Sequence, residues 1–158
     1  MRTIETTLDA QGLRFAVVVS RFTQPISRRL LDGCIARFEE LGSSDVNVMW
    51  VPGAFEIPLA ALQAAESGRY AAIVALGAVI RGETAHFEYV CRGVTDGCQG
   101  VALEVGLPVA FGVLTVDTVE QALARAALPG EDGVNKGAEA AATAVEMARL
   151  LEALVVEE

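Results

Sequence analysis

Short apolar runs alternate along the chain with longer segments in which apolar residues recur every three or four positions. The runs, rich in valine, isoleucine and alanine, are 13–20, 45–52, 70–80 and 108–116. Short runs that are almost entirely apolar are typical of strands buried on both faces. Because parallel strands need a crossover segment, usually a helix, the alternation predicts a parallel sheet with helices on both sides. We therefore expect an α/β fold, a flavodoxin-like three-layer sandwich around a four-stranded parallel sheet.

The segments between and after these runs predict five helices. Apolar residues at three- and four-residue spacing define the first, and Thr118 with Gln121 forms a capping-box pattern at the start of the fourth. The expected helices are about 25–41, about 55–67, one beginning near Thr84, one from Thr118 and one from about 135. No internal repeat, low-complexity tract or long linker divides the sequence, so residues 1–158 are predicted to form a single domain, with 1–12 as an extended N-terminal arm.

The composition of the chain limits the kinds of molecule that it is expected to bind. The formal net charge is -9, and the absence of a basic run argues against nucleic acid or an anionic membrane as a partner. No apolar stretch approaches the roughly 20 residues of a membrane span, and residues 1–12 lack the apolar core of a signal peptide, so a cytoplasmic protein is expected. A mean hydropathy of +0.42 indicates that some apolar surface is buried between subunits.

The three cysteines predict neither a disulfide nor a metal site. Their number is odd, and their spacing is not that of metal ligands. Cys91 and Cys98 would be two turns apart on one helix, about 10 Å, which is beyond the reach of a disulfide. We interpret all three, including Cys34, as reduced core thiols.

Unusual residues follow three of the predicted strands. Phe22 comes directly after the first, Pro52-Gly53 and Glu56 follow the second, and Thr84, a predicted N-cap, precedes His86 after the third. Because the loops after parallel strands meet at one edge of the sheet, where ligands bind, these side chains predict a pocket there. His86, the only histidine, is the natural proton shuttle near neutral pH.

Each of these residues also has an ordinary structural interpretation. Phe22 could pack on the helix that follows it, Glu56 could favour its helix dipole, and His86 could be a hydrogen-bonded helix-end residue. Residues 82–84 could offer amides to an anion, but they lack the glycines of a nucleotide-binding loop, which disfavours nucleotide cofactors. No serine elbow, CxxC pair or paired-histidine spacing occurs, which argues against triad hydrolysis and zinc chemistry.

Five motifs, in order and nearly end to end, resemble those of the 6,7-dimethyl-8-ribityllumazine synthase family. They are RF at 21–22, VPGAFEIPLAA at 51–61, LGAVIRGETAHFEYV at 76–90, PVAFGVLTVDTVEQALARA at 108–126 and NKGAEAA at 135–141. The resemblance implies the penultimate step of riboflavin biosynthesis. In that step 5-amino-6-(D-ribitylamino)uracil condenses with 3,4-dihydroxy-2-butanone 4-phosphate, releasing phosphate and water, and neither a cofactor nor a metal is implied.

The resemblance also implies roles for individual residues. For the pyrimidine substrate it implies that Phe22 stacks on the ring. The ribityl chain would be held by Ala54, Phe55 and Glu56, and the uracil edge by the backbone of Ala78, Val79 and Ile80. For the phosphate substrate it implies a site at a helix N-terminus lined by Glu83 and Thr84, with Arg125 as a cationic clamp. His86 would transfer protons, Phe111 would close the site, and Lys136 and Glu139 would lie nearby.

Residues 126–135, between Arg125 and Lys136, are longer than the corresponding connection of many family members. In the family this junction affects how pentamers pack into icosahedral shells, so the resemblance favours a free pentamer. Phe111 is expected to lie roughly 20 Å from the binding edge of its own chain, at about 3.3 Å per strand residue. We therefore expect active sites shared between neighbouring subunits of a homo-oligomer, with Phe111 and Arg125 reaching the pocket of the next chain.

Two other functions compete with the enzyme. A catalytically weak relative that binds riboflavin or lumazine, or acts as a scaffold, would keep most of these loops without needing His86 and Arg125. A flavodoxin-like electron carrier predicts a phosphate loop rich in hydroxyls and glycine after the first strand, and SRFTQP at 20–25 does not supply one.

Overall fold

A computed structural model describes residues 1–156 of the chain. Within them, four parallel strands form one sheet in the order β2-β1-β3-β4. The strands are β1 (Phe15–Ser20), β2 (Val46–Val51), β3 (Ala72–Ile80) and β4 (Val109–Val116). Each coincides with one of the apolar runs, so the predicted α/β sandwich is confirmed.

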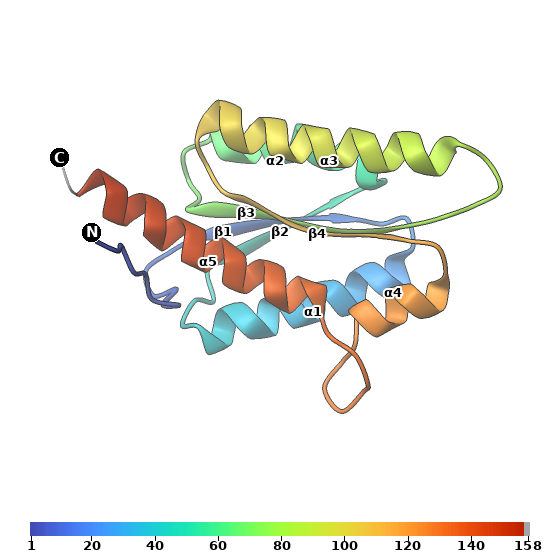
Figure 1. Cartoon of the computed structure of the whole chain (residues 1–158), viewed down its shortest axis with the longest axis horizontal. Helices are drawn as coiled ribbons and strands as arrows, with labels where there is room; N and C mark the ends of the chain where they lie inside the picture. The colour runs from blue at the N-terminus through green and yellow to red at the C-terminus, as the bar shows by residue number, and fades with distance from the viewer. Residues whose placement is uncertain (157–158) are drawn as a thin grey trace.

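Helices cover both faces of the sheet (Figure 1). Helices α2 and α3 lie on one face and α1, α4 and α5 on the other. Their bounds are α1 (Gln24–Glu40), α2 (Ile57–Glu66), α3 (His86–Val105), α4 (Val119–Arg125) and α5 (Lys136–Val155), with a short 3-10 helix η1 (Ala54–Glu56) before α2.

Two of the predicted helix starts are wrong. Phe55, placed in the first turn of an α-helix, lies instead in η1, because Glu56 N–H bonds to Gly53 O and closes a tighter turn. Thr84 is not the N-cap of α3, which begins at His86 after Ala85. The Thr84 hydroxyl still accepts a long 3.4 Å hydrogen bond from His86 N–H.

The sheet divides the core into two apolar clusters. Alternate residues of β1 point to opposite faces, with Phe15 and Val17 packed against α1 and α5 and Ala16 and Val18 against α2 and α3. On the α1 side, the rings of Phe15 and Phe38 stack with centroids 4.4 Å apart. Because helices cover both faces of the sheet, a ligand can reach the sheet only at the strand ends and at the outer edges.

Residues 1–10 form neither helix nor strand and run to the end of the sheet where α5 finishes (Figure 1). Arg149 of α5 holds this segment by donating from Nε to Asp9 O at 2.7 Å and from a terminal nitrogen to Gln11 O at 2.8 Å. The loops that follow the strands lie at the opposite edge of the sheet.

Candidate active site

The loops after β1, β2 and β3 surround a hollow of about 660 Å³ at the carboxyl edge of the sheet. Phe22 comes from the first loop, Glu56 from η1 and His86 from the first turn of α3, as the sequence predicts for the pocket. Phe22 is 73% exposed and Phe55 62% exposed, although aromatic rings are usually buried in a folded chain. The hollow therefore offers two open aromatic surfaces, a carboxylate and an imidazole.

Backbone geometry at Thr23 explains why Phe22 faces outward. Thr23 adopts a left-handed conformation with φ of 60°, which turns the chain sharply between β1 and α1. Its hydroxyl donates to Ala78 O at 2.9 Å, and Phe22 N–H donates to Pro52 O at 3.1 Å. The turn is thereby fixed to β3 and to the loop after β2, and the aromatic ring is held beside them.

Phe55 reaches the hollow because α3 has a glycine where the ring packs. A Cβ on Gly93 would lie 2.5 Å from Phe55 Cε2, which is closer than side-chain carbons approach. Gly97, one turn further on, makes the same kind of room for Pro58. The two glycines let η1 and α2 approach α3 closely and set the position of this wall.

The carboxyl end of β3 supplies backbone groups to the floor of the hollow. β3 pairs with β1 only as far as Leu76, whereas its pairing with β4 continues to Ile80. Ala78, Val79 and Ile80 therefore line the hollow along an edge that β1 does not cover. The carbonyl of Ala78 accepts a hydrogen bond from the Thr23 hydroxyl, which holds this end of β3 beside the loop after β1.

A charged cluster fixes the loop that carries Gly82 and His86. Arg81 Nε donates to Asp117 Oδ1 at 2.8 Å, its terminal nitrogen lies 3.6 Å from Glu88 Oε1, and its guanidinium lies 4.3 Å from the centre of the Phe87 ring. The hydrogen bond with Asp117 raises the pKa of Arg81 above its ordinary value. These contacts join the ends of β3 and β4 to the first turn of α3.

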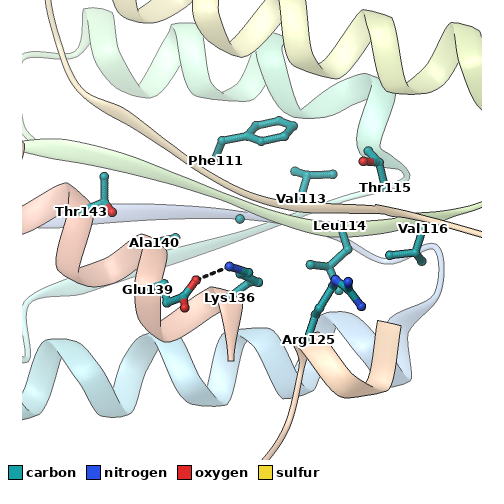
Figure 2. Close-up of a pocket in the computed structure, with 11 residues that line it drawn as sticks. Phe111, Val113, Leu114, Thr115, Val116, Arg125, Lys136, Glu139, Ala140 and Thr143 are labelled. Carbon is teal, nitrogen blue, oxygen red and sulfur yellow. Dashed lines mark ion pairs between the residues drawn. The ribbon is translucent and has the colours of Figure 1, made fainter. Parts of the chain in front are cut away.

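A second hollow of about 530 Å³ lies along β4 and takes the remaining predicted residues. Phe111, Arg125, Lys136 and Glu139 all line it, and none of them lines the first hollow. Figure 2 shows Phe111 on one face of β4 and Arg125, Lys136 and Glu139 on the other. β4 is an outer strand of the sheet, so this hollow opens at the side of the molecule.

The two cations of the second hollow differ in their partners. Lys136 Nζ lies 2.6 Å from Glu139 Oε2 and forms an ion pair with it, drawn as a dashed line in Figure 2. Arg125 donates to Gln121 O at 3.0 Å and has no carboxylate partner within residues 1–156. Arg125 is thus the cation whose charge is available to an anionic ligand.

The predicted site residues therefore form two groups on one chain. The first hollow brings together those expected to bind the pyrimidine substrate, with Thr84 and His86, whereas Glu83 lies in the adjoining loop and does not line it. Sequence reasoning missed Phe87, Tyr89 and Val90, which also line this hollow. Aromatic and apolar side chains on a helix are typical of core residues, although Tyr89 is 69% exposed.

Two features that residues 1–156 lack bear on metal chemistry and on membrane insertion. Residues 1–156 contain no group of three or more His, Cys, Asp or Glu side chains arranged to hold a metal ion. In the same residues, no helix combines the length and apolar content needed to cross a bilayer.

The sequence model of one protein family matches the chain from residue 12 to residue 152 of 158. The family is described as 6,7-dimethyl-8-ribityllumazine synthase. The match includes every strand of the sheet and every residue that lines the first hollow.

Proposed function

The chain belongs to the 6,7-dimethyl-8-ribityllumazine synthase family, a family of transferases, and from this premise we propose the reaction that it catalyses. The reaction is the condensation of 5-amino-6-(D-ribitylamino)uracil with 3,4-dihydroxy-2-butanone 4-phosphate to give 6,7-dimethyl-8-ribityllumazine, phosphate and water. The observation that carries the proposal is the hollow that gathers Phe22, Glu56 and His86 from three separate loops.

The first hollow suits the pyrimidine substrate chemically. A planar ring stacks on an exposed aromatic side chain such as Phe22, and the uracil edge bonds to backbone groups of Ala78, Val79 and Ile80. The ribityl hydroxyls bond to the Glu56 carboxylate and to backbone groups of Ala54 and Phe55 in η1.

The phosphate substrate needs positive or donor groups, and two features supply them. The loop at Glu83 and Thr84 leads into the N-terminus of α3, where backbone amides favour an anion. Arg125 supplies a guanidinium without a carboxylate partner in residues 1–156, and guanidinium pairs well with phosphate oxygens. Lys136, Glu139 and Phe111 line the wall beside Arg125.

His86 moves the protons that the condensation requires. The substrate amine attacks the butanone carbonyl, one water leaves as the imine forms, the phosphate group leaves in a later step, and the ribityl-bearing nitrogen closes the second ring with loss of a second water. Each step transfers a proton, which His86 at the rim of the hollow can accept or donate near neutral pH.

Placement of the two groups in separate hollows supports an active site between subunits. Arg125 and Phe111 lie along the outer strand β4, while His86 lies at the strand ends. In a cyclic head-to-tail ring, the side hollow of one chain meets the edge hollow of the next. We propose a homopentamer of this kind, in which residues 1–158 form one domain and residues 1–12 an arm.

A cytoplasmic location is part of the same proposal. The structure contains three free cysteines, and free thiols persist in reducing compartments.

The test is to mix the purified protein with both substrates and to follow the fluorescence of the lumazine product. We expect product to form faster than in the same mixture without protein, and without added metal or cofactor. Tight binding of riboflavin-like ligands with no acceleration of product formation would instead favour the binding or scaffold relative.

A further inference from the structure

The connection between α4 and α5, residues 126–135, is an ordered hairpin that projects from the helical layer (Figure 1). Ala126 and Asn135 form an antiparallel bridge at its base. Ala127 N–H donates to Val134 O at 3.0 Å, and Val134 N–H donates to Ala124 O at 2.9 Å. Because Arg125 and Lys136 flank this bridge, the hairpin sets the separation of the two cations that line the second hollow.

Two residues fasten the hairpin to α1. Arg29 Nε donates to Ala126 O at 2.9 Å, and the Arg29 guanidinium also forms an ion pair with the Glu131 carboxylate. The same carboxylate accepts a 3.0 Å hydrogen bond from Leu128 N–H. Arg29 thus holds both the base and the tip of the loop, through one backbone carbonyl and one side chain.

Asn135 completes the attachment on the side of α5. Its Nδ2 donates to Arg29 O and to Ala127 O, each at 3.0 Å, while its Oδ1 accepts from Ala138 N–H and caps the helix. There is no room for a side chain at Gly33 or Gly137 beside this amide, because a Cβ at either position would collide with Asn135 or with the α1 backbone. The start of α5, and with it Lys136, is therefore seated against α1.

Neither Arg29 nor Glu131 lines the second hollow, so any effect on a ligand there passes through the backbone of the hairpin. We propose that Arg29 and Glu131 are positioning residues that place Arg125 and Lys136 for the phosphate-bearing substrate. The proposal rests on the proposed function for the identity of that substrate. It assigns the connection of residues 126–135 a role in placing residues of the proposed active site.

The proposal is tested with steady-state kinetics of Glu131→Ala and Arg29→Gln in the full chain. Each variant should raise KM for the phosphate substrate about five- to tenfold, with kcat and KM for the pyrimidine substrate within about twofold of wild type. Asp132→Ala is the matched control, because Asp132 is the next acidic residue of the hairpin and makes no ion pair within residues 1–156. It should leave all three constants unchanged.

A double-mutant cycle separates positioning from general damage. Adding Glu131→Ala to Arg125→Ala should cause a smaller change than the five- to tenfold change expected in the wild-type background, because one of the two cations through which Glu131 acts is already absent. A phosphate-substrate KM that is unchanged in both single variants would overturn the proposal, and so would an equal rise in both KM values.

Titration with inorganic phosphate, followed by phosphorus NMR, distinguishes a failure of the positioning proposal from a failure of the proposed reaction. A wild-type chain that forms no lumazine refutes the proposed reaction. Phosphate that binds wild type and Asp132→Ala alike, but binds Glu131→Ala several-fold more weakly, supports the positioning role in either case. Equal phosphate binding by all three proteins refutes it.

Discussion

At the scale of single residues, the proposed role of His86 predicts how the rate acceleration is divided between proton transfer and substrate placement. An amine and a ketone condense slowly without an enzyme, and holding them together contributes several kcal/mol to the acceleration. His86→Ala should therefore lower kcat by on the order of 10²-fold or less, the low end for general acid–base catalysis. Continuous fluorescence assays at saturating substrates measure the effect. A kcat equal to that of wild type would remove His86 from the proton-transfer role.

The buried thiol of Cys34 predicts a loss of stability at high pH. Burial raises the pKa of Cys34 to about 12, whereas the unfolded thiol ionises at about 8.5. Because the folded state keeps the proton longer, this contribution is complete below about pH 8.5 and declines as the pH rises toward 12. Between these two pH values the slope of the decline should approach about 1.4 kcal/mol per pH unit, the value for one proton.

Urea unfolding at pH 8 and pH 10, on wild type and Cys34→Ala, measures this difference. The variant leaves a small cavity and should be less stable at pH 8, but its stability should fall less steeply with pH. Parallel pH profiles for the two proteins would show that the thiol does not contribute.

Residue types in the sequence predicted which side chains line the hollow better than they predicted the backbone geometry that places them. Phe22, Glu56 and His86 were found because an aromatic, a carboxylate and an imidazole follow three successive strands. The φ of Thr23 could not be predicted, since a β-branched residue rarely adopts a left-handed conformation. The contact between Arg81 and Asp117 was also hidden, because the two residues are 36 positions apart.

At the scale of elements, two glycines of α3 predict opposite effects of the same substitution. Gly93→Ala should lower the free energy of unfolding by about 1–3 kcal/mol, because the new methyl group overlaps the Phe55 ring. Gly100→Ala should raise the free energy of unfolding by up to about 1 kcal/mol. The added Cβ would have no atom outside its own helix backbone within 4 Å, and alanine favours a helix more than glycine does. Thermal unfolding followed by circular dichroism gives both values, and equal shifts would contradict the packing argument.

The strands could be predicted more accurately than the helix starts. A strand covered on both faces leaves a continuous apolar run, and the four runs coincide with β1 to β4. A helix start depends on which carbonyl the first free amides reach. Gly53 closes a 3-10 turn before α2, and the Thr84 hydroxyl accepts from the first residue of α3 rather than from a later amide. Such alternatives differ by one hydrogen bond, which the pattern of side chains does not reveal.

At the scale of the whole molecule, the two hollows predict complementation between inactive chains. In the proposed ring, His86→Ala would impair the edge hollow and Arg125→Ala the side hollow, so the activity of each parent should be reduced. Rings refolded from a mixture should contain interfaces in which an intact His86 faces an intact Arg125, and their activity should exceed that of both parents. Size-exclusion chromatography confirms that mixed rings form. Mixed rings with no more activity than the parents would assign each site to a single chain.

The left-handed turn at Thr23 also bears on attempts to make the protein more heat-resistant. A β-branched residue with φ of 60° costs roughly 1–2 kcal/mol, and glycine would remove that strain. Glycine would also remove the hydroxyl that ties the turn to Ala78 and holds the ring of Phe22 in place. Laboratory evolution under thermal selection alone should therefore favour substitutions here that trade ligand affinity for robustness, so the screen must include turnover from its first round.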